Sequence, residues 1–365
     1  MTETIKVLID DIDPNRGILG NITKTNHTDF ALRSIFPSRS TTNIEYIASG
    51  ALKYINRDKL DKYVYPIVIH NLTYINFMFS IGDSDYDIIG LLPRQVKKQY
   101  FKNKVVILII ILEPLGGNNS AIDIMSFVKM IESNPRYNNM LFLTLHYIDS
   151  PNFLFINILQ DVMVDWSPLD DGLMHYDEIK NYDNRHFCCF LMNFRESEER
   201  KWLIKFFIKN KLLTKGFVSA TNWHDEELLF DNLDIESTLN KVSLNIIPEG
   251  NFDRRLDHFM SEKVYRCFKY KKPFIYLGQY QSLQYIRSIG YKTFSPIINE
   301  DYDQIENDKI RFIEVCKQIK ILVDKPIEEL KDDMCQLEEI CEHNYKLFIS
   351  TQNEAKHTLI SRLTK

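Results

Sequence analysis

A short part of the chain places an acid, a hydroxyl and a lysine at the turning points of a strand–helix–strand pattern. An apolar run at 242–247 stops at a proline and is followed by the acid Glu249. A helical stretch then opens with Ser261, Glu262 and Lys263, and a second apolar run closes the pattern. A helix N-terminus presents free N–H groups and partial positive charge, which suit a diphosphate. The pattern therefore predicts a nucleotide diphosphate site, with Lys263 on the diphosphate and Glu249 on the ribose hydroxyls.

Each of these assignments has a structural alternative. A lysine near a turn is usually a solvated surface residue, and Lys263 could be one. Glu249 could instead accept a hydrogen bond from a nearby backbone N–H, as capping carboxylates do. Glu262 suits capping its own helix as well as it suits contacting a ligand. These alternatives stay open at the level of sequence.

The same block resembles the nucleotide-sugar half of GT-B glycosyltransferases, in particular the α-1,3-fucosyltransferases and related phage- and virus-encoded glycosyltransferase-like proteins. Their pattern is an acid, a short loop, Thr/Ser-Glu-Lys, a helix, Pro-Phe/Val-aliphatics-Gly, Gly-aromatic-Lys-x-Phe and Asp/Asn-Glu-x-Tyr-Asp. A longer loop at 250–260 departs from it, and the resemblance covers roughly 186–316, with the first half similar only in outline. The matching residues here are Glu249, Ser261-Glu262-Lys263, Pro273-Phe274, Gly278, 290–294 and 299–303.

The resemblance implies an α/β fold of two Rossmann-like domains that face a cleft (GT-B type). The charged, helical pattern of 325–365 adds a C-terminal helical tail. It implies a hexosyltransferase-type glycosyltransferase that moves a sugar from a UDP- or GDP-sugar donor to an acceptor hydroxyl. The displacement would be in line, inverting and metal-independent, with the nucleotide-sugar as co-substrate and no separate cofactor. The alternative is a catalytically inactive GT-B-like protein that binds nucleotide-sugars or partners. Tyr302 and Asp303, within the last motif, are expected to be structural.

Further residues could stabilise the leaving diphosphate in the absence of a metal. Arg195 follows an apolar run in a turn, and Arg200 lies in the first turns of the next helix. Both are interpreted as donor-binding, because cations stabilise the charge that develops on a diphosphate leaving group. Asn193, in the same turn, is interpreted as a contact to the nucleotide.

The first half offers a candidate for the general base that activates the acceptor hydroxyl. Glu113 follows the strongly apolar run at 105–112 and precedes Pro-Leu-Gly-Gly. Active sites of open α/β sheets lie beyond the carboxyl ends of strands, so Glu113 is interpreted as catalytic, with His146 in reserve. The alternative is a turn carboxylate held by the Gly-Gly loop.

Alternation of apolar runs with helical segments favours an α/β architecture with parallel strands. Strands are expected at 65–70, 105–112, 140–145 and 153–159 in the first half, with a helix at 121–131. In the second half we expect a strand at 187–192, a helix at 198–211 and strands at 242–247 and 274–277. A polar linker is expected at 166–182. The expected domains are 1–180 on the acceptor side, 181–324 for the nucleotide-sugar, and a helical segment at 325–365 that packs back or binds a partner.

Composition argues against several other classes of protein. The chain has 365 residues and a net charge of -5, which is unlike a broadly basic nucleic-acid-binding surface. The six Cys include no C-x-x-C pair, which indicates reduced, buried thiols. The nine His include no H-x-x-x-H pair, so the sequence predicts no metal site. The acidic triplet with Asp83 and Asp85 leaves one rival, a metal-dependent transferase.

The start of the chain lacks a signal peptide pattern, and the longest apolar run is too short to span a membrane. A soluble, cytoplasmic protein is therefore expected. Richness in Asn, Ile, Lys and Tyr suggests a viral or phage source, which would place it in the host cytoplasm. The acceptor, whether glycan, protein or modified nucleic acid, and the oligomeric state stay open.

Overall fold

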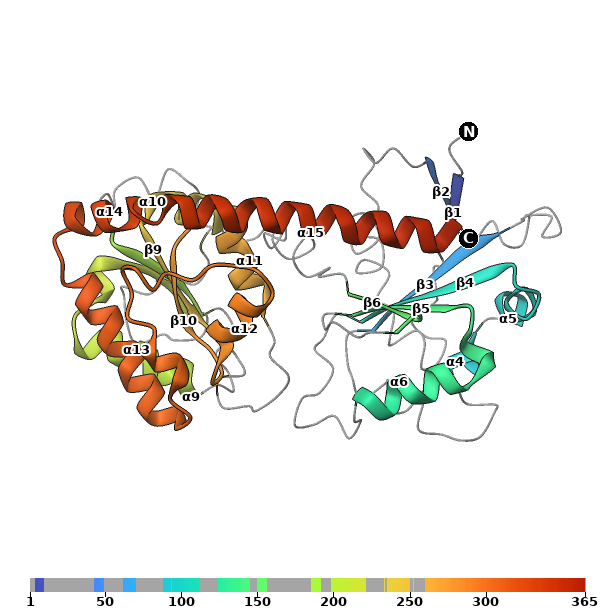
Figure 1. Ribbon diagram of the computed structural model, residues 1–365, viewed down its shortest axis with the longest axis horizontal. Helices are drawn as coiled ribbons and strands as arrows, with labels where there is room; N and C mark the ends of the chain where they lie inside the picture. The colour runs from blue at the N-terminus through green and yellow to red at the C-terminus, as the bar shows by residue number, and fades with distance from the viewer. Residues whose placement is uncertain are drawn as a thin grey trace. The chain divides into compact units, whose positions relative to one another are not determined.

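The computed structural model describes residues 4–9, 43–48, 62–69, 88–92, 94–111, 124–144, 150–155, 185–191, 198–220, 233, 235–249, 252 and 260–364. The chain divides into two compact units, Met1–Met163 with Thr351–Lys365, and Val164–Ser350. Each unit is built on a parallel sheet with helices packed beside it (Figure 1). The predicted α/β class is therefore confirmed.

The described part of the first unit contains a six-stranded parallel sheet in the order β2-β1-β3-β4-β5-β6. Its central strand β4 is apolar along its whole length and almost fully buried, as expected for a strand that is covered on both faces. The strands are β1 (Thr4–Ile9), β2 (Asn43–Ala48), β3 (Tyr63–Ile69), β4 (Val105–Ile111), β5 (Met140–Thr144) and β6 (Phe153–Phe155). The helices are α4 (Ile88–Leu91), α5 (Arg94–Tyr100), α6 (Ile124–Ser133) and the short η3 (Pro135–Tyr137).

The described part of the second unit contains a four-stranded parallel sheet in the order β10-β9-β7-β8. Its strands are β7 (Phe187–Phe190), β8 (Gly216–Ser219), β9 (Leu244–Pro248) and β10 (Phe274–Leu277). The helices are α9 (Glu198–Lys209), η4 (Leu213–Lys215), α10 (Ile235–Lys241), α11 (Glu262–Lys269), α12 (Ser282–Ser288), η5 (Asp301–Gln304), α13 (Asp308–Val323), α14 (Ile327–Cys335) and α15 (Glu338–Thr364).

A buried arginine on α13 holds the chain that leaves the sheet of the second unit. Arg311 is 1% exposed, and its Nε donates to the carbonyl of Gly278, 3.2 Å away, directly after β10. Its Nη2 donates to Phe252 O at 2.9 Å and its Nη1 to Ile305 O at 2.8 Å. Three carbonyls that would otherwise be buried without donors are thus satisfied by one planar side chain.

The C-terminal tail is helical, as expected, and is the pair α14 and α15. The first half of α15 belongs to the second unit because Asn344, 1% exposed, pairs with the backbone of Lys292. Lys271 adds an ion pair to Glu342 at 2.5 Å. Residues 325–350 cluster with the second unit and 351–365 with the first.

The expected strands and helices with strong apolar patterns correspond to observed elements. Of the strand expected at 153–159, the described residues contain β6 (Phe153–Phe155). The helix expected at 121–131 corresponds to α6. β1, β2 and β8 were not predicted. The linker expected at 166–182 lies outside the described residues, so the boundaries at 180 and 181 stay predictions.

Five of the six thiols are buried and Cys335 is exposed, so the expectation of buried thiols is wrong for Cys335. Burial raises the pKa of Cys267 to about 12.

Among the helices of the described residues, none has the length and apolarity needed to cross a bilayer.

Gly216 provides a test of the packing in the second unit. A Cβ atom at Gly216 would lie 2.3 Å from Cζ of Phe187, whose ring is fully buried. We expect Gly216→Ala to lower the free energy of unfolding by about 1–3 kcal/mol, the usual cost of overpacking, measured by urea denaturation. Ser219→Ala, on the same strand, removes a buried hydroxyl without a hydrogen-bond partner in the described part of the chain, and should cost less than about 0.5 kcal/mol. Equal losses would contradict the packing argument.

Candidate functional site

The strands of the second unit's sheet are parallel, so their carboxyl ends share one edge, and such sheets bind ligands at that edge. Glu249 follows β9 directly, and its backbone N–H donates to the carbonyl of Leu277 on β10 at 3.0 Å. The Glu249 side chain is 5% exposed. A carboxylate at such a position requires donors, because burial of an unpaired charge is costly.

Ser261 supplies one of these donors. Its hydroxyl donates to Oε1 of Glu249 and accepts from the backbone N–H of Lys263 at 3.3 Å, which makes Ser261 the N-cap of α11. A serine in an extended conformation just before a helix is a favoured cap. The predicted acid and the predicted helix start are thus joined by a direct hydrogen bond.

Tyr276 on β10 adds a second hydroxyl beside the acid, and it was not predicted. Its side chain is 2% exposed, and its hydroxyl has no hydrogen-bond partner in the described part of the structure. Burial raises the pKa of the Tyr276 phenol well above its usual range, and the neighbouring Glu249 carboxylate raises it further. Gly278 makes room for the ring, since a Cβ there would lie 2.3 Å from Cε1 of Tyr276. Tyr276 is therefore a neutral, buried donor next to Glu249.

Lys263 and Glu262 form an ion pair in the first turn of α11. The Lys263 Nζ lies 2.9 Å from Oε1 of Glu262, and the side chains are only 18% and 14% exposed. Burial opposes ionisation of Glu262, but Lys263 and Arg266 outweigh it and leave the pKa of Glu262 below its usual value. Lys263 is consequently not a solvated surface lysine. Its ammonium also lies 3.5 Å from the Ser261 hydroxyl.

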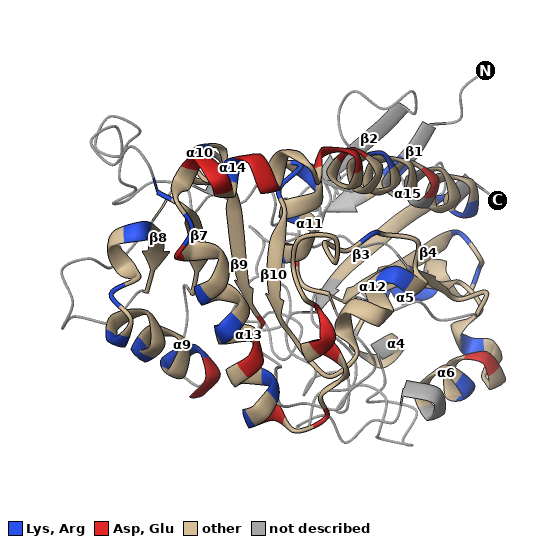
Figure 2. Cartoon of the chain, turned by 60° about the vertical axis from the view of Figure 1, so that its left-hand side comes forward, with Lys and Arg blue, Asp and Glu red and all other residues tan. Residues whose placement is uncertain are grey.

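Arg200 bridges the ends of two strands at the same edge. Figure 2 shows basic residues in several turns of α9, among which Arg200 is the buried one. Its Nη1 donates to the carbonyl of Leu191, after β7, and its Nη2 to that of Pro248, the last residue of β9, both at 3.3 Å. The guanidinium therefore fixes the backbone just before Glu249.

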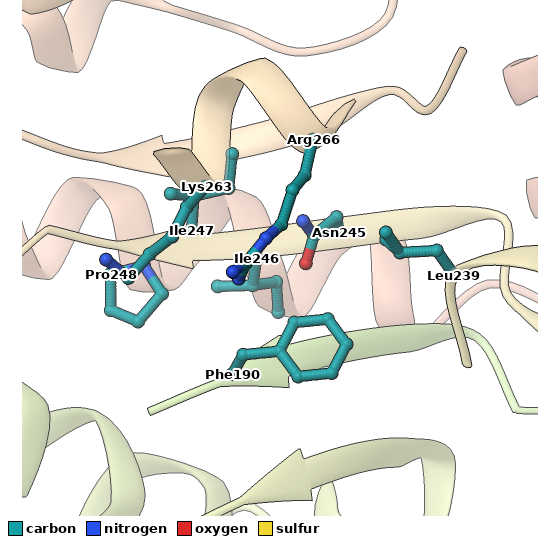
Figure 3. A pocket seen from close by; sticks show the side chains of 8 residues that line it. All are labelled: Phe190, Leu239, Asn245, Ile246, Ile247, Pro248, Lys263 and Arg266. Carbon is teal, nitrogen blue, oxygen red and sulfur yellow. The ribbon is translucent and has the colours of Figure 1, made fainter. Parts of the chain in front are cut away.

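A small pocket lies beside this cluster, between β9, α10 and α11 (Figure 3). Its cavity volume is about 10 Å³, close to the minimum for one water molecule. Figure 3 shows the Arg266 side chain reaching from α11 toward β9. The lining residues are Phe190, Leu239, Asn245, Ile246, Ile247, Pro248, Lys263 and Arg266.

Two of the polar lining residues, Arg266 and Asn245, were missed from the sequence. The spacing of Arg266, three residues after Lys263, puts both cations on one helix face and could have pointed to it. Asn245 sits in an apolar run, where its Nδ2 donates to Cys267 Sγ at 2.9 Å and its Oδ1 accepts from Cys188 Sγ at 3.3 Å. No sequence signal marks that network.

Asp303 has the structural position that was expected of it. Its two oxygens accept from the backbone N–H groups of Leu283 at 2.9 Å and Gln284 at 3.0 Å. The carboxylate thereby caps the N-terminus of α12, where negative charge is favourable. Tyr302 beside it is buried in the core.

The remaining predicted site residues lie outside the described part of the chain. These are the proposed base Glu113, its reserve His146, the donor residues Asn193 and Arg195, and the rival metal residues Asp83 and Asp85. Their assignments stay predictions. Within the described residues, no group of three or more His, Cys, Asp or Glu is arranged to hold a metal ion.

Neither a known family model nor a curated protein sequence matches this chain. Solved structures with a distant likeness include the glycotransferase of kitacinnamycin, at 9% identity and a TM-score of 0.40 over 100% of this chain and 99% of that one. The DNA-modifying enzyme β-glucosyltransferase is 10% identical, with a TM-score of 0.42 over 99% of both chains. The glycosyltransferase SnogD from Streptomyces nogalater is 10% identical, with a TM-score of 0.38 over 96% of this chain and 99% of its own. Likeness at this level carries no argument about activity.

Two conservative substitutions distinguish the two hydroxyls that surround Glu249. Ser261→Ala removes the helix cap and the donor to a buried carboxylate, so we expect a loss of about 1–3 kcal/mol in the free energy of unfolding. Tyr276→Phe removes a hydroxyl that lacks a partner among the described residues, so stability should stay equal or rise slightly. Denaturant titration measures both. A larger loss for Tyr276→Phe than for Ser261→Ala would contradict the described hydrogen bonding.

The ion pair on α11 predicts a pH dependence of stability. Because the folded-state pKa of Glu262 is lowered, its contribution is fully present above the unfolded value of about 4.3 and is lost as the pH falls through the folded pKa. Glu262→Gln should therefore be less stable than the original chain at pH 7, and the difference should shrink below about pH 4. Denaturation at several pH values tests this, with exposed Glu339→Gln as the control. A constant difference from pH 7 to pH 3 would contradict the ion pair.

Proposed function

We propose that the second unit binds the nucleotide diphosphate of a sugar donor, and that the chain is a glycosyltransferase acting on an acceptor hydroxyl. The observation that carries this proposal is the cluster of Glu249, Ser261 and Tyr276 at the N-terminus of α11. It places one buried carboxylate and two hydroxyls beside a helix end that favours negative charge.

The cluster supports recognition of a ribose by hydrogen bonding. Ser261 occupies one oxygen of Glu249, and the other oxygen can accept from a ribose hydroxyl. Tyr276 lies beside the Glu249 carboxylate and its raised pKa keeps the phenol neutral, so its hydroxyl can donate to the same ribose hydroxyl. A site that pairs its own buried polar groups with substrate hydroxyls discriminates strongly against analogues that lack them.

The diphosphate would lie against the first turn of α11. The N–H groups there have no acceptor within the helix, and Lys263 is the cation held over this turn. Lys263 now pairs with Glu262, so an incoming phosphate would share the ammonium with that carboxylate. Arg266, one turn further on, adds a second cation to the helix. Cations and N–H groups can supply the stabilisation of the leaving diphosphate that a metal supplies elsewhere, which supports metal-independent transfer.

The remaining parts of the proposal come from the sequence: from the family resemblance, from strand-end position and from composition. Glu113 would take the proton of the acceptor hydroxyl, and Asn193 and Arg195 would complete the donor site. The donor would be a UDP- or GDP-hexose, and the reaction would proceed by an inverting, in-line displacement between the two Rossmann-like domains. A cytoplasmic enzyme of viral or phage origin is part of the same proposal.

Ligand-dependent stabilisation tests the donor site directly. Thermal unfolding is followed with UDP, GDP, CMP and their sugar conjugates, with and without EDTA. A ligand at a hundred times its dissociation constant should stabilise the fold by about 2.7 kcal/mol. We expect such a shift with one nucleotide family, unchanged by EDTA. No shift with any of them would overturn the proposal, and a shift that EDTA abolishes would favour a metal-dependent transferase.

Substitutions then locate the site. Glu249→Gln and Lys263→Gln should each weaken binding of that nucleotide by about tenfold or more, as expected when a charge-assisted hydrogen bond of about 1.5–3 kcal/mol is lost. Lys269→Gln, at the other end of α11, is the matched control and should bind normally. Isothermal titration calorimetry measures all three. Unchanged binding by both site variants would place the ligand elsewhere.

Turnover distinguishes the enzyme from the inactive alternative. Release of nucleotide diphosphate from the sugar conjugate is measured with the original chain and with Glu113→Ala. We expect release from the original chain and a loss of about 100-fold or more in the variant, the range for removal of a general base. Donor binding without release, unchanged by Glu113→Ala, would support a binding protein.

A further inference from the structure

A polar groove lies at the amino edge of the first unit's sheet, where β4, β5 and β6 begin. Its cavity volume is about 560 Å³, within the usual range for ligand sites. The groove shares no residue with the cluster at α11, and it is independent of the function proposed above. It is lined by Lys62, Asn103, Lys104, Val105, Val106, Asn138, Asn139, Met140, Leu141, Pro151, Asn152 and Arg362.

The groove is positively charged in a chain that is negative as a whole. Lys62, Lys104 and Arg362 line it, and none of the described lining residues is an acid, whereas the chain carries a net charge of -5. The Lys104 ammonium has no ion-pair partner in the described part of the structure. A cavity lined by cations and by no described acid favours an anionic occupant.

Arg362, near the end of α15, is held in place from one side only. Its Nη1 donates to the carbonyls of Pro151 at 2.6 Å and Phe153 at 3.2 Å. Both bonds use the same nitrogen, which leaves Nη2 and Nε to donate to a ligand. A guanidinium fixed in this way can present a planar pair of donors to an oxyanion.

The asparagines of the groove are also held by hydrogen bonds that direct their polar atoms. Asn139 Nδ2 donates to Oδ1 of Asn103 at 2.6 Å, so the acceptor atom of Asn103 is used and its own amide group remains to donate. Asn103 has a left-handed backbone with φ of 56°, which asparagine tolerates better than most residues. This turn carries the amide next to Lys104 on the rim of the groove.

We propose that this groove binds a phosphate-bearing ligand. Lys62 and Lys104 supply charge, while Arg362 and the Asn103 amide supply directed donors to phosphate oxygens. The cavity exceeds what one phosphate group needs, so a ligand with more than one phosphate fits it better. The same chemistry could come from a free di- or polyphosphate or from the phosphodiester chain of a single-stranded nucleic acid.

The test compares two probes at constant ionic strength on the full chain. Inorganic pyrophosphate and an oligothymidylate of about ten residues are titrated by calorimetry, both into the original chain and into Lys263→Gln, which removes a cation of the proposed donor site. We expect saturable binding of at least one probe at a site whose affinity is equal in both proteins. The probe that binds more tightly identifies the source of the phosphate. The absence of saturable binding by either probe would overturn the proposal.

Paired charge removals then assign the binding to the groove. Lys62→Gln/Lys104→Gln should weaken binding at least about tenfold, the change that 1.4 kcal/mol produces in a dissociation constant. Lys98→Gln/Lys102→Gln removes the same charge from exposed positions nearby and should bind as the original chain does. An equal loss of affinity in the two double variants would show general charge attraction and would overturn the proposed site. Binding that is lost only in Lys263→Gln would assign the phosphate site to the second unit and would also overturn the proposal.

Discussion

The hydrogen bond between Ser261 and Glu249 is the interaction on which the candidate site depends. Glu249 is buried at the end of β9, and a carboxylate there is tolerable only with a donor and a favourable field. Ser261 supplies the donor, and the N-terminus of α11 supplies the field. One bond therefore fixes the strand end, the helix start and the orientation of the acid, and it leaves the Tyr276 hydroxyl beside them.

Buried arginines hold the backbone around this bond. Arg200 donates hydrogen bonds to carbonyls at the ends of β7 and β9. Arg311 donates to the carbonyl of Gly278, directly after β10, and to that of Phe252. Buried carbonyls at strand ends require hydrogen-bond donors, and a buried guanidinium offers several donors in one plane. The carboxyl edge of the sheet is consequently fixed by the protein itself, which is the preorganisation that a binding site requires.

Sequence reasoning found those parts of the fold and site whose local chemistry is strong. The cap at Ser261 and the apolar runs around it predict α11 and its strands, because capping and burial are decided locally. It missed Tyr276 and the hydrogen bonds by which Arg200 holds backbone carbonyls at two strand ends. Those roles depend on which strands are neighbours, and no local pattern encodes the order β10-β9-β7-β8. β1, β2 and β8 were missed because short strands resemble other short, partly apolar segments.

The most direct test of the central claim, that Glu249 recognises ribose hydroxyls, is a comparison of ribose and 2′,3′-dideoxyribose forms of the nucleotide diphosphate that binds. Dissociation constants are measured for the original chain and for Glu249→Gln. The account predicts that the original chain binds the ribose form at least about tenfold more tightly, which corresponds to 1.4 kcal/mol, and that the variant loses this preference. Equal affinity of the original chain for both forms, or a preference that survives in Glu249→Gln, would contradict it.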